Sequence, residues 1–136
     1  MSNIGIIIGF DLGRFRCGWA ISDILKQVAI PKDSFSLRKD CKKLKLVKQF
    51  VLNNRIDGVV IGRPLSPLVN DVNKNKYTEA QCFLMNYLEL KDTKVCFQDE
   101  RFSSSVYKGS MPRVKDGLAA ALILQEFISS NYNILD

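Results

Sequence analysis

The stretch that decides the fold is Ile4-Gly5-Ile6-Ile7-Ile8-Gly9-Phe10-Asp11-Leu12-Gly13. An apolar run of this length, rich in Ile, predicts a strand that is buried on both faces of a sheet. Asp11 comes where the strand leaves the sheet, and Gly13 predicts a tight turn because Gly accepts a positive φ at low cost. An acid at the carboxyl end of a central strand is a common element of phosphate and metal sites. Turns also favour Asp for local hydrogen bonding, so this stretch alone supports both interpretations.

Two further strands are predicted directly after the first. Larger and smaller side chains alternate from Cys17 to Ser22, which is typical of a strand. The connection from Asp11 is too short to hold a helix, so the two strands should form an antiparallel hairpin. A third strand is predicted from Gln27 to Phe35, with a kink at Pro31.

Helices dominate the remainder of the chain. Apolar residues at helical spacing predict an amphipathic helix from Arg38 to about Asn54, whose lysines form a solvated face or contact RNA. A polar loop is predicted from Asn70 through Asn75, and a second helix begins near Tyr77. The final helix is predicted from about Arg113 to Ser130 and should be well buried, because its middle is apolar nearly all round.

Two short apolar strands, Val59–Gly62 and Lys94–Gln98, alternate with these helices. Strands joined through helices pair in parallel by right-handed crossovers. The chain is therefore predicted to be α/β, with a mixed five-stranded sheet of three antiparallel and then two parallel strands and helices on both faces. Its 136 residues fit one domain, residues 1–136, without a disulfide or structural metal.

The composition excludes several classes of protein. No segment approaches the roughly 18 apolar residues of a membrane span, and no signal peptide is recognisable, so we expect a cytoplasmic protein without a membrane partner. The net charge of +6 suggests a polyanionic partner, although many Lys-rich proteins simply have a solvated basic surface. The chain has no His, which removes the usual general base, so catalysis would use carboxylates, Lys, Tyr, Ser or a metal. The cysteines form no C-x-x-C pair and are predicted to be reduced and mostly buried; they are Cys17, Cys41, Cys82 and Cys96.

Three acids are candidates for one metal site. Asp11 and Glu100 each end a strand, and if both strands flank Val59–Gly62 their carboxyl ends share one edge of the sheet. Asp116 enters from the final helix, although an acid there is also explained by the helix dipole. Converging carboxylates repel one another, and Mg²⁺ or Mn²⁺ relieves this repulsion while activating water against a phosphodiester. Basic residues beside the acids would hold the backbone of a nucleic acid; they are Arg14, Arg16, Arg63, Arg101 and Lys115.

Four motifs, in order, resemble the YqgF/RuvX family of Holliday-junction-resolvase-like nucleases. They are GFDLG at 9–13, VIGRPL at 60–65, DERFSS at 99–104 and KDGLAAALILQ at 115–125. The resemblance implies a ribonuclease H-like fold and a divalent-metal nuclease site with Asp11, Glu100 and Asp116 as catalytic acids. It also implies a role in maturing the 5′ end of pre-16S ribosomal RNA in the bacterial cytoplasm.

Alternative functions are a Holliday-junction DNA resolvase and a nucleic-acid-binding module without catalysis. The second is motivated by residues 101–116, which form a shorter segment than is usual in this family. The protein would be a monomer or a homodimer, and two-fold symmetric DNA junctions would favour the dimer. A nucleotide-phosphate binder of the actin or sugar-kinase type would need a second lobe, for which the chain is too short.

Overall fold

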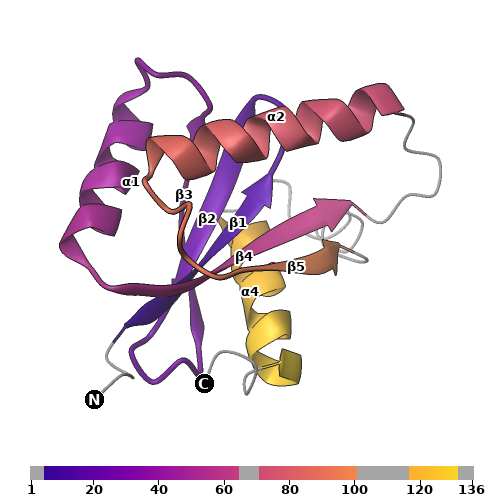
Figure 1. Ribbon diagram of the computed structural model, residues 1–136. Helices are drawn as coiled ribbons and strands as arrows, with labels where there is room; N and C mark the ends of the chain where they lie inside the picture. The colour runs from indigo at the N-terminus through magenta and orange to yellow at the C-terminus, as the bar shows by residue number, and fades with distance from the viewer. Residues whose placement is uncertain (1–4, 65–70, 101–116, 132–136) are drawn as a thin grey trace.

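The computed structural model describes residues 5–64, 71–100 and 117–131 (Figure 1), with only the backbone described at 63–64, 71–78, 99–100 and 131. None of the helices in these ranges combines the length and apolar content needed to cross a membrane. The elements in chain order are β1 (Ile6–Leu12), β2 (Arg16–Ser22), β3 (Ala29–Ser36), α1 (Lys42–Asn53), β4 (Ile56–Pro64), α2 (Asp71–Tyr87), β5 (Val95–Glu100) and α4 (Leu118–Asn131).

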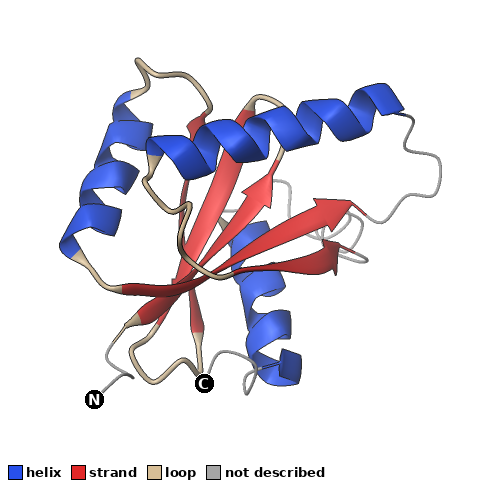
Figure 2. Cartoon of the chain, viewed as in Figure 1, coloured by secondary structure: helices blue, strands red, loops and turns tan. Residues whose placement is uncertain are grey.

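The strands form one five-stranded sheet in the order β3-β2-β1-β4-β5 (Figure 2). β1 pairs antiparallel with β2 and β2 with β3, whereas β1 pairs parallel with β4 and β4 with β5. The mixed sheet predicted from the sequence is therefore confirmed. β1 is its central strand, and the apolar run explains why: Ile7 and Ile8 are 1% and 0% exposed although they face opposite sides of the sheet.

Helices cover both faces of the sheet, α1 and α2 on one side and α4 on the other (Figure 1). Ile8 and Phe10 of β1 pack in the cluster beneath α1 and α2, and Ile7 packs in the cluster beneath α4. Between them, Gly9 lets α4 approach closely, because a Cβ at Gly9 would lie 2.9 Å from the Cβ of Leu124. The face beneath α4 is the one to which Asp11 belongs, since alternate residues of a strand share a face.

Helix α2 is longer than predicted. It begins at Asp71, six residues before Tyr77, so the prediction of a polar loop through Asn73 and Asn75 is wrong. Asn and Asp are weak helix formers, but each costs less than about 1 kcal/mol relative to Ala, and extending an existing helix needs no new nucleation. The buried second half of α2, which includes Ala80 and Leu84, anchors the helix.

Helix α4 begins later than predicted. Gly117, the residue before it, has a φ of +82°, which is incompatible with a helix that continues from Arg113. The amide of Ala121 donates to the carbonyl of Gly117 at 2.9 Å, so Gly117 caps the helix from outside. The prediction of a start near Arg113 is therefore wrong, and residues 113–116 themselves lie outside the described ranges.

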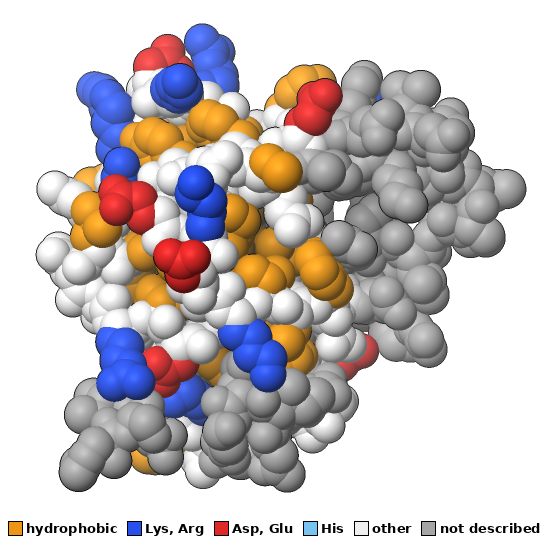
Figure 3. Space-filling model, viewed as in Figure 1, with side chains coloured by type: hydrophobic (Ala, Val, Ile, Leu, Met, Phe, Trp, Pro, Cys, Tyr) orange, Lys and Arg blue, Asp and Glu red, His pale blue; other side chains and the backbone are white. Residues whose placement is uncertain are grey.

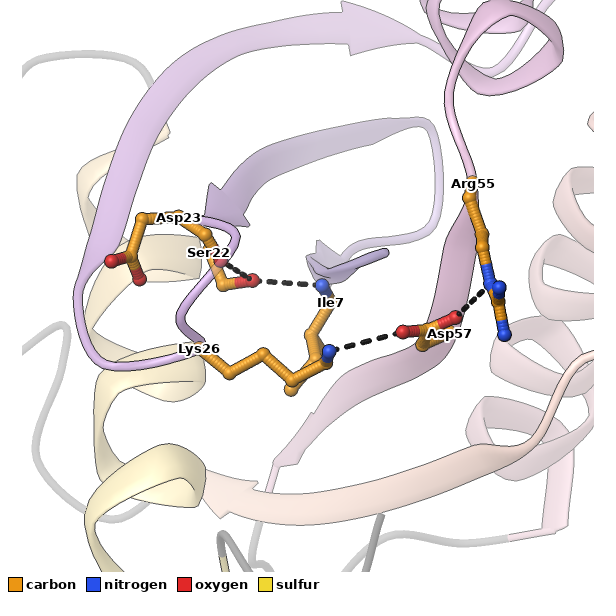
Figure 4. A network of polar contacts seen from close by, with 6 residues as sticks. All are labelled: Ile7, Ser22, Asp23, Lys26, Arg55 and Asp57. Atoms are coloured by element: carbon orange, nitrogen blue, oxygen red, sulfur yellow. Dashed lines mark hydrogen bonds and ion pairs between the residues drawn. The ribbon is translucent and has the colours of Figure 1, made fainter. Parts of the chain in front are cut away.

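A network of polar contacts ties together the amino ends of β1 and β4 (Figure 4). The buried hydroxyl of Ser22 accepts a hydrogen bond from the amide of Ile7 at 2.8 Å. Beside it, the ammonium of Lys26 lies 3.0 Å from the carboxylate of Asp57, which the guanidinium of Arg55 also contacts at 2.8 Å. The side chains of Lys26 and Asp57 are only 9% and 14% exposed, so this pair is held largely away from water.

Replacing Asp57 with Asn is expected to lower the free energy of unfolding by about 3 kcal/mol at neutral pH, because it leaves the buried ammonium of Lys26 without its counter-charge. Burial alone raises the pKa of Asp57, but the hydrogen bonds and charges of Lys26 and Arg55 outweigh it and lower the pKa below the ordinary value. A lowered folded-state pKa adds stability that is lost as the pH falls, so the difference between the variant and the wild type should begin to shrink below about pH 4 and vanish only below the lowered pKa. Urea unfolding from pH 3 to 8 measures both effects.

The matched control is Asp40→Asn, since Asp40 pairs with Arg38 on the surface, where both side chains are at least 73% exposed. Solvent screens such a pair, and its loss should leave stability unchanged across the pH range. A constant difference between Asp57→Asn and the wild type down to pH 3 would contradict the role given to the charge of Asp57.

Candidate active site

Asp11 lies near the carboxyl end of the central strand, one residue before β1 ends. It stands opposite Gly18 of β2 and Gly62 of β4, so no side chain flanks it from either neighbouring strand at its own level. The Asp11 side chain is neither fully buried nor fully exposed. The central strand therefore holds this carboxylate, with a glycine on each side, at the end of the sheet where the parallel strands have their carboxyl ends.

The start of α4 lies next to Asp11. A Cβ placed on Gly18 would lie 3.8 Å from the Cβ of Asp11 and 3.6 Å from the Cα of Gly117. Gly117 is in turn pressed against β2 and β3, because a Cβ on it would lie 2.7 Å from the carbonyl oxygen of Trp19 and 2.8 Å from the backbone of Lys32. Glycines at two positions far apart in the sequence thus bring the amino end of α4 to the acid of β1.

Glu100 ends β5 at the same edge of the sheet. Its backbone stands opposite Pro64 of β4, and β4 separates β5 from β1. The two acid-bearing strands therefore flank the strand that holds Val59–Gly62, which is the arrangement on which the predicted site depended. At Glu100 and Arg63 only the backbone is described, so the directions of their side chains are not given. The other predicted site residues, Arg101, Lys115 and Asp116, lie outside the described ranges. Among the side chains that are described, no three acidic or cysteine residues gather into a cation site.

Cys17 lies beside Asp11, opposite Leu12 in the β1–β2 ladder. Burial raises the pKa of the Cys17 thiol well above its ordinary value, and the nearby charge of Asp11 raises it further. The thiol therefore stays protonated at neutral pH and behaves as a core residue. The prediction of mostly buried cysteines is wrong for the others, because Cys82 is exposed and Cys41 and Cys96 are half-buried, although all four are free thiols.

The tip of the β1–β2 hairpin follows directly on Asp11 and carries Arg14 and Arg16, both exposed. The guanidinium of Arg16 donates to the hydroxyl of Ser34 at 2.9 Å. The turn needs Gly13 for space, because a Cβ there would lie 3.0 Å from the carbonyl oxygen of Arg16. Among the described glycines only Gly117 has a positive φ, so the predicted reason for Gly13 is wrong.

Two features of this end of the molecule were not anticipated from the sequence. The first is Phe15, 73% exposed between the two arginines of the hairpin tip. The second is that the basic residues before α1, Arg38 and Lys39, lie close to this hairpin tip. The residue before them, Leu37, donates its amide to the carbonyl of Phe15 at 2.8 Å. Figure 3 shows Lys and Arg side chains gathered over α1 and the turn before it. The alternation Arg-Phe-Arg at a hairpin turn is the sequence signal that could have identified the first feature.

Comparison with known proteins gives matches over most of the chain. The sequence model of the RuvX family, described as "Holliday junction resolvase", matches residues 5–130. A Ureaplasma parvum protein named "Putative pre-16S rRNA nuclease" is 28% identical over 92% of this chain and 97% of its own length. Proteins of the same name from Sulfurihydrogenibium and Streptococcus gordonii are 30% and 28% identical, over 90% and 93% of this chain and 88% and 99% of their own lengths.

Two solved structures share the fold. Thermus thermophilus RuvC in complex with a Holliday junction substrate superposes with a TM-score of 0.52 at 14% identity, over 92% of this chain and 94% of its own. The fowlpox virus resolvase in complex with Holliday junction DNA gives a TM-score of 0.51 at 11% identity, over 92% and 97%. These likenesses concern the fold, which is ribonuclease H-like as predicted.

Proposed function

The chain belongs to the RuvX family, and we propose from this premise that it is a divalent-metal-dependent nuclease acting on structured RNA. Its substrate would be precursor 16S ribosomal RNA in the cytoplasm, cut at the 5′ end. The relatives from Ureaplasma and Sulfurihydrogenibium carry the name "Putative pre-16S rRNA nuclease". The observation that carries the proposal is the approach of the amino end of α4 to Asp11 at the carboxyl edge of the sheet.

Glu100 and Asp116 are proposed as the partners of Asp11. Gln98 of β5 donates to Glu126 of α4 at 2.7 Å, which assigns Gln98 to the face that α4 covers. Position 100 follows two residues later, and alternation along a strand assigns it to the same face as Asp11. Asp116 directly precedes Gly117, about 3.8 Å away between Cα atoms, and Gly117 lies beside Asp11. This closeness supports the proposal that Asp116 belongs to the same site.

The proposed ligands suit Mg²⁺ or Mn²⁺, because all three donors are carboxylates and hard cations prefer oxygen ligands. When bound, such ions supply an activated water and stabilise the leaving oxygen of a phosphodiester. The residues of the chain provide position and charge: β1 holds the Asp11 carboxylate between Gly18 and Gly62, and the exposed guanidinium groups of Arg14 and Arg16 bind phosphates of the strand to be cut. Arg63, Arg101 and Lys115 are proposed to extend this contact along the nucleic acid.

The test is a cleavage assay with three substrates: a precursor 16S fragment carrying its 5′ extension, a perfect RNA duplex and a four-way DNA junction. We expect cleavage of the precursor in Mn²⁺ or Mg²⁺, no cleavage in EDTA, and recovery when the metal is restored, because ligand carboxylates alone do not activate water. Mapping the cut by primer extension identifies the cleaved bond.

A second candidate function, a Holliday-junction DNA resolvase, is favoured by the description of the matching family. Paired, symmetric cuts in the four-way junction that exceed precursor cleavage would support it over the RNA nuclease. Binding of the precursor with a steep salt dependence, but without cleavage in any divalent metal, would instead identify a binding module and contradict both nuclease assignments.

A further inference from the structure

We propose that the tip of the β1–β2 hairpin is a stacking site for an unpaired base of the nucleic-acid substrate, with Phe15 as its platform. This inference rests on the proposed function and adds a requirement to it. The substrate would carry an unpaired nucleotide close to the bond that is cut.

Phe15 is an exposed ring on a constrained turn. Its side chain is 73% exposed, yet the backbone around it is fixed by two hydrogen bonds. The amide of Leu37 donates to the carbonyl of Phe15 at 2.8 Å, and the amide of Gly13 donates to the carbonyl of Arg16 at 2.9 Å. The turn thus presents the ring without a further loss of backbone freedom on binding.

A hollow of about 270 Å³ lies between the hairpin tip and α2, close to the lower limit of small-ligand pockets, roughly 300 Å³. The part of its wall that the structure describes is mainly aromatic and aliphatic and includes the cation Arg14 and the carboxylate Glu79, which suits a planar ring that carries N–H donors. Phe83 is held in place by stacking on Tyr87, with ring centroids 5.8 Å apart. The lining residues are Arg14, Phe15, Leu37, Glu79, Ala80 and Phe83.

The chemistry of this hollow favours a base over an apolar protein segment. Arg14 and Arg16 flank Phe15, and exposed Arg38 and Lys39 follow closely after Leu37. A cationic track with an aromatic side chain in it is the usual arrangement for single-stranded nucleic acid, since cations bind phosphates and the ring stacks on a base of any sequence. The Glu79 carboxylate can accept from the amino group of a base, as acidic side chains do from cytosine N4.

The hollow lies close to Asp11 along the chain. Phe15 is four positions after Asp11, so the two Cα atoms lie at most about 14 Å apart. The hollow itself opens on the face of the sheet that α2 covers, whereas Asp11 belongs to the face that α4 covers, so the substrate would pass around the hairpin tip. A base that stacks on Phe15 therefore belongs to a nucleotide within a few positions of the phosphate nearest Asp11. A fully paired duplex cannot offer such a base unless it is opened.

The experiment measures binding of a fluorescent single-stranded RNA in Ca²⁺ to the full chain and to Phe15→Leu, which keeps an apolar side chain but removes the stacking face. We expect affinity to fall about tenfold for Phe15→Leu and to be retained in Phe15→Trp. The slope of affinity against salt should not change, because no charge is removed. The control is Leu25→Ala, which removes an apolar side chain that is 65% exposed in the turn between β2 and β3, and it should bind as the wild type does.

An abasic scan identifies the stacked nucleotide. Removing the base at one position should weaken wild-type binding about tenfold and have no further effect on Phe15→Leu, whereas a paired duplex should bind both proteins equally. Normal binding and cleavage by Phe15→Leu, with no position sensitive to base removal, would overturn this inference and leave the proposed nuclease intact. A wild-type protein that binds no nucleic acid would overturn both.

Discussion

Replacing Asp11 with Asn is expected to reduce the rate of metal-dependent cleavage at least about 100-fold, while leaving the protein folded and able to bind nucleic acid. Loss of a residue that merely orients a metal ligand typically costs 10- to 100-fold, so loss of a proposed ligand should reach at least the upper end of that range. A 100-fold loss corresponds to about 2.7 kcal/mol of transition-state stabilisation. Single-turnover cleavage of the precursor fragment measures the chemical step.

The same substitution should not destabilise the fold. Asn has nearly the shape of Asp, and its neighbours across the ladder, Gly18 and Gly62, present no side chain for it to strain. If three carboxylates converge, removing one charge also relieves repulsion, so the melting temperature without metal should stay the same or rise. A lower melting temperature together with lower activity would indicate a structural role for Asp11.

The control for this substitution is Asp23→Asn. The Asp23 carboxylate accepts hydrogen bonds from the amides of Gln27 and Val28 at 2.8 and 3.0 Å, in the turn at the far end of the sheet from Asp11. The Asp23→Asn variant should cleave the precursor as the wild type does, at a temperature where both proteins are folded. Equal cleavage by the Asp11 and Asp23 variants would refute the assignment of Asp11.

Replacing Gly117 with Ala is expected to lower the free energy of unfolding by roughly 3 kcal/mol or more. A side chain at a φ of +82° costs about 1–2 kcal/mol. The new Cβ would also lie 2.7–2.8 Å from backbone atoms of Trp19 and Lys32, and overpacking of this kind costs about 1–3 kcal/mol. Backbone atoms of paired strands cannot move aside as a flexible side chain can, so α4 must shift on the sheet.

Chemical denaturation of the purified variant measures this loss, and cleavage below the unfolding transition measures its effect on the site. The matched control is Gly18→Ala, which adds the same methyl group next to Gly117 but meets its nearest neighbours at 3.6–3.8 Å. These are ordinary contact distances, so Gly18→Ala should change stability by less than about 1 kcal/mol. Equal destabilisation by the two substitutions would contradict the steric account of Gly117.

The strands were predictable because their signals are local. The Ile-rich run that became β1 and the alternation that became β2 each depend on neighbouring residues only. The start of α2 was not predictable from the same kind of signal. Its first turns, from Asp71, carry no apolar periodicity and owe their helical state to the buried half of the helix that follows.

The candidate site was only partly predictable. Asp11 and Glu100 could be assigned to one edge because element order and parallel pairing follow from the chain. The hollow beside Phe15 could not be foreseen, because it is formed by the β1–β2 hairpin and α2, and these are separated along the sequence by β3, α1 and β4.

By itself, the sequence determined the order of the elements, the central position of β1 and the placement of Asp11 at the end of that strand. It did so through local periodicity and through the rule that alternating helices and strands build a parallel sheet. Only the tertiary structure decided that α4 begins directly after Gly117 and that Gly117 lies against β2 and β3 beside Asp11. The physical reason is that this contact is steric and non-local: the clash that makes Gly necessary exists only once the sheet has formed.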